Sequence, residues 1–135
     1  MQRRGILIIY WITTVILAFI MFSGAVGEIL HQWGTLETHT ILGYPIYFLT
    51  IIGTWKILGT IAILLPNFPR LKEWAYAGMF FIMTGAFVSH AAAGDYGAGA
   101  YHLITTGIIV VFVLISWAFR PQSRTLRTFL TANIQ

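Results

Sequence analysis

The chain has 135 residues, of which 58% are hydrophobic and only 9% are charged. Soluble globular domains carry about 25% charged residues, so this chain cannot cover a water-facing surface in the ordinary way, and its mean hydropathy of +0.80 indicates lipid as the solvent for most of it. This composition excludes a water-soluble enzyme. Because there is no cysteine, the chain itself cannot perform dithiol exchange, ligate an iron–sulfur cluster or attach a c-type haem.

Four apolar stretches are each long enough to cross a bilayer as a helix, which takes about 20 residues. They are residues 5–27, 45–65, 74–93 and 102–119, and Lys56 is the one charged side chain inside them. The sequence therefore predicts an all-α polytopic membrane protein, a bundle of four transmembrane helices within residues 1–119.

The connections between these stretches are short and contain helix-breaking residues. Residues 66–69 (PNFP) end the second stretch, and residues 94–99 (GDYGAG) form a turn before the fourth. Residues 31–44 are longer and mildly polar. We expect them to lie on the membrane surface, partly helical, with His31 and His39 solvated.

The basic residues lie on one side of the predicted bundle. Seven of the eight fall before the first stretch, between the second and third, or after the fourth: Arg3, Arg4, Arg70, Lys72, Arg120, Arg124 and Arg127. The two opposite connections carry the acids Glu28, Glu37 and Asp95 and no basic residue. Lys and Arg near the ends of spans mark the cytoplasmic side, so both termini are expected to be cytoplasmic.

The two ends of the chain each allow a second interpretation. The basic start, apolar run and small residues 23–25 (SGA) resemble a secretory signal, but the apolar run is longer than the 7–15 residues usual there, so we expect a retained helix. In the tail, residues 120–135, apolar side chains recur at helical spacing: Leu126, Phe129, Leu130 and Ile134. This tail is expected to be an amphipathic segment along the headgroups or a frayed basic end.

Lys56 is the most informative residue of the sequence. It lies about 16 Å along the second span at 1.5 Å per residue, too deep for its side chain to reach water easily. A charge at that depth usually marks a partner, a wet cavity or a functional site, so Lys56 is either a ligand-binding or proton-carrying group or an interhelical tether to a carboxylate. Small residues on neighbouring turns, Gly53, Gly59 and Thr60, predict that it points inward. Adjacent Trp55 lines the same cavity or faces lipid.

A second cluster of polar residues is expected at the outer ends of the helices, opposite the side that carries the basic residues. Glu28 follows the first span, His90 lies near the end of the third, Asp95 is in the turn, and His102 opens the fourth. Chain geometry brings them to one level, where they can relay protons or bind a polar head group. A metal site is disfavoured because no metal-binding spacing of histidines is present, and a haem held by His90 and His102 remains an alternative, as does plain capping at the interface.

Four segments of the chain resemble the DoxX-like family of small bacterial four-helix membrane proteins. They are residues 42–50 (LGYPIYFLT), 56–59 (KILG), 66–78 (PNFPRLKEWAYAG) and 89–95 (SHAAAGD), within a resemblance that covers roughly residues 5–119. Relatives in the wider group are associated with quinone-linked sulfur oxidation and with oxidative-stress defence. The family's recurrent Lys and His positions match Lys56 and His90, and the resemblance implies a location in a bacterial inner membrane.

Three functions remain open at this point. The first is a non-catalytic membrane subunit that binds a quinone or another lipid-soluble ligand, through Lys56, Trp55 and the outer polar group, and supports a redox partner. The second is a small proton-coupled transporter acting as a homo-oligomer, and the third is a structural anchor. The expected partners are membrane lipids and a redox-enzyme subunit, not nucleic acid. No nucleophile–base–orienter set can be assembled from the residues available, so activity by the chain alone is not expected.

Overall fold

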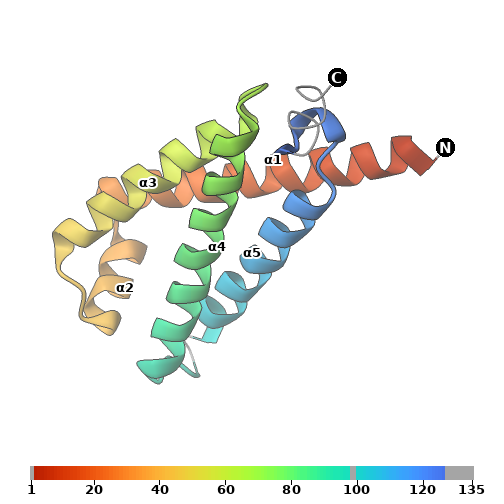
Figure 1. The fold of residues 1–135 in the computed structure, drawn as a ribbon. Helices are drawn as coiled ribbons and strands as arrows, with labels where there is room; N and C mark the ends of the chain where they lie inside the picture. Colours follow the sequence, from red (N-terminus) through yellow and green to blue (C-terminus); the bar gives the residue numbers. More distant parts are fainter. Residues whose placement is uncertain (1, 98–99, 127–135) are drawn as a thin grey trace.

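The protein is a bundle of long helices in the computed structural model, which describes residues 2–97 and 100–126 (Figure 1). The helices are α1 (Gln2–Ile29), α2 (Trp33–Leu42), α3 (Ile46–Leu64), α4 (Pro69–Ala92) and α5 (Ala100–Ala118), followed by the short 3-10 helix η1 (Gln122–Arg124). Four of them, α1, α3, α4 and α5, are long and apolar enough to cross a membrane. Together with the absence of any strand in the described part of the chain, this confirms the predicted all-α membrane bundle.

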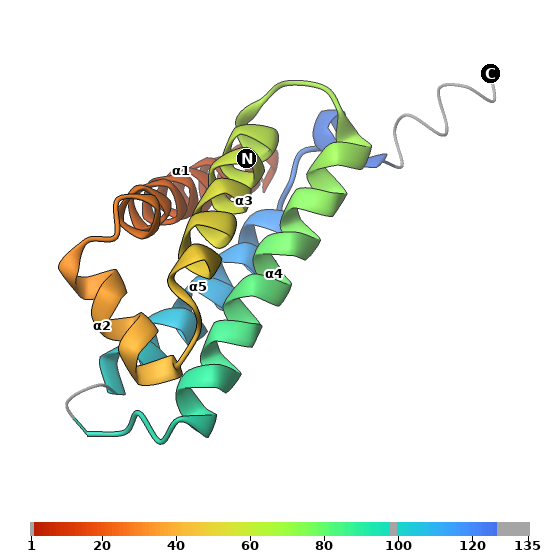
Figure 2. The ribbon, with the colours of Figure 1, turned by 90° about the vertical axis from the view of Figure 1, so that its left-hand side faces the viewer.

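The four long helices form a closed ring of contacts. Helix α1 packs against α3 and α5, and α4 packs against the same two helices. In Figure 1, α1 lies across the other long helices and does not run alongside α4 and α5. Figure 2 shows that α1 ends before the level where α4 ends and α5 begins, and that α2 lies between the end of α1 and that end of the bundle.

The helix boundaries follow local signals, with one extension. Gly43 ends α2 in the left-handed conformation (φ 73°), which glycine adopts without steric cost. Proline begins α4 at Pro69, where its missing N–H would be unpaired in any case. The helix therefore includes residues 69–73, which we had expected to lie before the third span. The expectation that residues 31–44 are partly helical agrees with α2.

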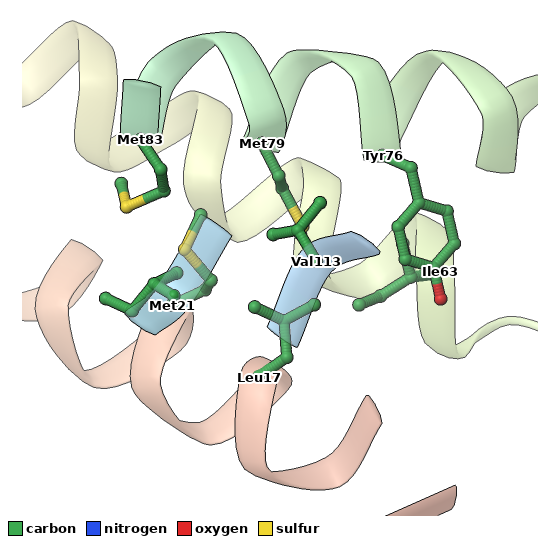
Figure 3. Packing of buried hydrophobic residues seen from close by; sticks show 8 residues of the cluster. Leu17, Met21, Ile63, Tyr76, Met79, Met83 and Val113 are labelled. Atoms are coloured by element: carbon green, nitrogen blue, oxygen red, sulfur yellow. The ribbon is translucent and has the colours of Figure 1, made fainter. Parts of the chain in front are cut away.

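The core contains apolar side chains from all four long helices (Figure 3). They are Leu17 and Met21 of α1, Ile63 of α3, Tyr76, Met79 and Met83 of α4, and Ile109 and Val113 of α5. Large apolar side chains on the outside, such as Phe19 (73% exposed) and Phe81 (70% exposed), face the surroundings of the bundle. Such a surface is stable in a bilayer, where lipid tails are as apolar as leucine.

A chain of hydroxyl groups crosses the core near the end of the bundle where α1 begins and α5 ends. Ser116 on α5 is hydrogen-bonded to Thr14 on α1 (2.7 Å) and to Tyr76 on α4 (2.7 Å). Ser116 and Thr14 are fully buried. Because a polar group in hydrocarbon needs a partner, these bonds connect three helices at a fixed register.

Basic residues at the same end satisfy helix termini. Lys72 is fully buried, and its Nζ donates to the carbonyl oxygens of Ala62 (2.9 Å) and Leu65 at the end of α3. Arg120 donates to Glu73 at 2.6 Å, and Arg124 donates to a carbonyl oxygen of α3 at 3.2 Å. The first part of the predicted tail therefore folds back onto the bundle, while residues 127–135, with most of the expected amphipathic pattern, lie outside the described residues.

Candidate functional site

The deep lysine has a carboxylate partner. Lys56 on α3 is 8% exposed, and its Nζ forms a short ion pair with Oε1 of Glu28 near the end of α1. We had expected Glu28 at the level of His90, Asp95 and His102. It lies beside Lys56 instead, because α1 crosses the bundle obliquely and ends before its outer end (Figure 2). The second oxygen of Glu28, Oε2, is buried, and no described residue forms a hydrogen bond with it.

The approach of α1 to α3 at this pair depends on a glycine. A Cβ placed on Gly53 would lie 2.8 Å from the carbonyl oxygen of Ala25, 2.8 Å from Cγ1 of Ile29 and 3.3 Å from Cβ of Glu28. Gly53 is one turn before Lys56 on α3, so its missing side chain lets the two backbones come close where the ion pair forms. Gly59, one turn after Lys56, packs against Met79 of α4, so both small residues lie at contacts between helices.

The ion pair borders a cavity of about 380 Å³, which we call the outer cavity. Its polar lining comes from Lys56, Glu28, His90, His39 and Ser89. Its other walls are mainly apolar: Leu42, Tyr44, Phe48, Leu49, Ile52, Phe81, Ile82, Met83, Gly85 and Ala86. The structure therefore brings Lys56 and His90, predicted separately, to one cavity between α1, α2, α3 and α4.

His90 is oriented by two neighbours. It is 3% exposed, and its Nδ1 is 2.7 Å from Oδ2 of Asp95. Because a carboxylate accepts hydrogen bonds, Nδ1 carries the proton and donates it. The ring of His102 stacks on that of His90, with 4.9 Å between centroids and 8° between planes. His90, Asp95 and His102 thus form one cluster, of which His90 reaches the outer cavity.

The stacking of His90 and His102 does not fit the haem alternative. Two axial histidines must point a nitrogen each at one iron between them, whereas these rings lie face to face with nearly parallel planes. The haem macrocycle has no space between the stacked rings of His90 and His102. Within residues 2–97 and 100–126, no three His, Asp or Glu side chains gather closely enough to hold a metal ion.

Two other predictions about side chains near the site have different outcomes. His39 was expected to be solvated; it is partly exposed, but it lines the outer cavity, and its Nδ1 is buried with no hydrogen-bond partner among the described residues. The folding of residues 33–42 into α2 brings His39 there, and a one-dimensional pattern did not reveal it. Trp55 is 62% exposed and does not line the outer cavity. Trp55 instead lines a second cavity, and Lys56 is also part of the lining of that cavity.

Comparison with known families places this geometry in context. The family model described as the DoxX-like family matches residues 12–119. The chain belongs to the DoxX-like family. No curated protein sequence and no solved structure matches it.

The region of this DoxX-like protein that matches the family includes the whole candidate site. All six predicted site residues lie within it: Glu28, Trp55, Lys56, His90, Asp95 and His102. The match ends at residue 119, so the tail that packs back through Arg120 and Arg124 is outside it. The family membership and the four apolar helices establish an integral, multi-pass membrane protein.

Proposed function

We propose that this protein is a membrane subunit that binds a quinone, or a similar lipid-soluble molecule with carbonyl or hydroxyl groups, in the outer cavity and supports a redox partner. The observation that carries the proposal is that a buried lysine–carboxylate pair and an oriented histidine line one mainly apolar cavity of about 380 Å³. Small-molecule pockets usually measure about 300–1,000 Å³ and combine apolar walls with a few convergent polar groups.

The hydrogen-bonding groups of the cavity complement both forms of a quinone. An ammonium group has three donors, of which Lys56 gives one to Glu28, so others can bind a quinone carbonyl. Oε2 of Glu28 accepts no hydrogen bond from the described part of the chain, and a hydroxyl of the reduced ligand would supply one. With Nδ1 donating to Asp95, Nε2 is the His90 atom that can exchange a hydrogen bond or proton with a ligand.

The first experiment is purification of the full chain with its native lipids in mild detergent, followed by chromatographic analysis of extracted quinones. In the second, the wild-type protein in nanodiscs is titrated with dimethoxy-methyl-benzoquinone, a quinone head group without a tail. Lys56→Met should weaken binding by about tenfold or more, since a hydrogen bond from a charged group contributes about 1.5–3 kcal/mol. The control is Arg70→Met, an exposed basic residue outside the cavity. Unchanged binding by Lys56→Met, or no binding by wild type, contradicts the proposal.

The redox role is proposed to involve a partner, and the chain, which lacks cysteine, holds no iron–sulfur cluster of its own. We expect that partner to be a subunit with its own redox cofactor. Membranes that contain both proteins should reduce or oxidise the quinone, and Lys56→Met should slow this reaction while Arg70→Met leaves it unchanged. Equal rates in membranes that lack this protein argue against the partner role.

We propose a bacterial inner membrane as the location, with both termini in the cytoplasm. The positions of the basic residues support this orientation, since Lys72, Arg120 and Arg124 gather at the end of the bundle that carries the ends of α3 and α5. The chain lacks cysteine, so single cysteines can be placed at exposed Gln32 and Ser123. In intact cells, a membrane-impermeant maleimide should label the cysteine of Gln32→Cys and spare that of Ser123→Cys, and the reverse would refute the orientation.

Proton-coupled transport is a second candidate, favoured by one observation. Glu28 was expected at the membrane edge, yet its pairing with Lys56 places a carboxylate inside the bundle, next to a cavity. Ionisable groups within membrane spans commonly form proton pathways. Uptake of a lipophilic cation into proteoliposomes under a pH gradient tests this function, and equal uptake by wild type and Glu28→Gln argues against it.

A further inference from the structure

A second cavity lies beside the outer cavity, between α3 and α4. Its volume is about 500 Å³, and we call it the lateral groove. Its lining is apolar except for Lys56 and the indole N–H groups of two tryptophans, and it includes the small residues Gly59, Ala62, Ala75 and Gly78. Trp55 and Trp74, which also line it, are 62% and 80% exposed. The lateral groove is therefore bordered by side chains on the outer, lipid-facing surface of the bundle.

The two cavities are adjacent along α3 and α4. Lys56 of α3 and Phe81 and Ile82 of α4 line both of them. The polar groups are distributed unequally: Glu28 and His90 border only the outer cavity. The lateral groove offers no hydrogen-bonding side chain besides Lys56 and the two indoles. Of these two chambers, the outer cavity thus has most of the hydrogen-bonding groups and the lateral groove is almost wholly apolar, and the two meet at three shared side chains.

We infer that the ligand of this protein is a long-tailed lipid, with its polar head in the outer cavity and its isoprenoid or acyl tail in the lateral groove. This inference rests on the proposed function, and it specifies the ligand class as an amphiphile instead of a compact molecule. A tail in the groove replaces bilayer lipid, so its contribution comes from close contact with the groove walls. Because Lys56 lines both cavities, its ammonium group would lie where the polar head of the ligand joins its tail.

Two glycines of α4 allow the chambers to be filled separately. Gly78 lines only the lateral groove and Gly85 lines only the outer cavity. Both are exposed, and a Cβ on either one would have no atom within 4 Å. Leucine is therefore accepted by the fold at each position and is a better helix former than glycine. Gly24 of α1 has the same properties and lines neither cavity, so Gly24→Leu is the matched control.

The experiment compares a tailless and a tailed probe in nanodiscs, with empty nanodiscs correcting for partition into lipid. The probes are dimethoxy-methyl-benzoquinone and its decyl derivative. Gly78→Leu should weaken binding of the decyl probe by about tenfold, through the loss of roughly ten tail contacts, and leave the tailless probe unchanged. Gly85→Leu should weaken both probes, and Gly24→Leu neither.

The outcomes separate this inference from the proposed function. If wild type binds the tailless probe but Gly78→Leu binds the decyl probe as wild type does, the tail site is refuted and the cavity proposal stands. If wild type binds neither probe, both are refuted. A photoreactive diazirine at the end of the decyl chain gives a second measurement on the unaltered protein. It should label groove-lining residues such as Leu58 and Ala75, and labelling confined to residues outside the lateral groove overturns the inference.

Discussion

The substitution Gly53→Ala tests the close approach of α1 and α3 on which the Lys56–Glu28 pair depends. The added Cβ would lie 2.8 Å from a backbone oxygen of Ala25 and 2.8 Å from Cγ1 of Ile29. Ordinary contacts between such atoms begin near 3.5 Å, so α1 and α3 must separate by roughly half an ångström or more. The nearest obstacle is backbone, which cannot rotate away as a flexible side chain can.

The expected cost follows from two opposing effects. Overpacking in a well-packed interior destabilises by about 1–3 kcal/mol, and here it also shifts the helix that carries Glu28. Replacing glycine by alanine within a helix returns about 1 kcal/mol through helix propensity. We therefore expect Gly53→Ala to lower the free energy of unfolding by up to about 2 kcal/mol. The matched control is Gly59→Ala, whose Cβ would meet only the side chain of Met79, with its terminal methyl group at 3.3 Å and its Cγ at 3.9 Å. Methionine is flexible, so that variant should be neutral or slightly stabilised.

The assay is reversible unfolding of the purified protein in mild detergent by titration with sodium dodecyl sulfate, followed by far-ultraviolet circular dichroism. Both variants gain one methyl group on the same helix, so a difference between them reports the local environment alone. Equal stabilities of Gly53→Ala and Gly59→Ala would refute the reasoning, because they would mean that α1 and α3 are not held in contact at Gly53.

Three further substitutions test the polar contacts of the bundle, each in the same unfolding assay. Lys56→Met should destabilise by about 3 kcal/mol because it leaves the charge of Glu28 buried and unpaired, and adding Glu28→Gln should recover most of that loss; equal losses in the single and double variants would contradict the pairing. Ser116→Ala should cost about 1 kcal/mol by removing the hydrogen bonds to Thr14 and Tyr76, whereas no change would mean that these hydroxyls find other partners. Lys72→Met should cost about 1–3 kcal/mol, since the fully buried ammonium group satisfies two carbonyl oxygens at the end of α3, and a stability equal to that of wild type would argue against this capping role.

The pattern of apolar stretches predicted most of the fold because the bilayer imposes it locally. A span needs about 20 apolar residues whatever its neighbours are, so the four long helices follow from composition along the chain. The prediction that Lys56 and His90 point inward had a similar basis, since a polar group facing hydrocarbon is costly, and both are buried. The start of α4 differed because residues 69–73 include three charged side chains, and two of these, Lys72 and Glu73, are paired with carbonyl oxygens near the end of α3 and with Arg120 after α5.

The sequence predicted which residues belong to the candidate site better than it predicted how those residues are arranged. Lys56 and His90 were selected by depth and residue type, and both line the outer cavity. His39 was missed, because its place there depends on how α2 folds back toward α3 and α4. The burial of its Nδ1 depends on how the helices are assembled, and no sequence pattern predicts it.

The composition that excludes a water-soluble protein also singled out Lys56 as the one charge within the predicted spans. The sequence by itself determined the membrane environment, the four helices and this one unusual residue, because each follows from the free energy of placing a side chain in lipid. The tertiary structure alone decided that Glu28 is its partner and that two cavities meet beside it. The reason is physical: which residues of two helices face each other depends on the angle and distance at which they cross, and at Gly53 that distance is set by contacts with residues far away in the chain.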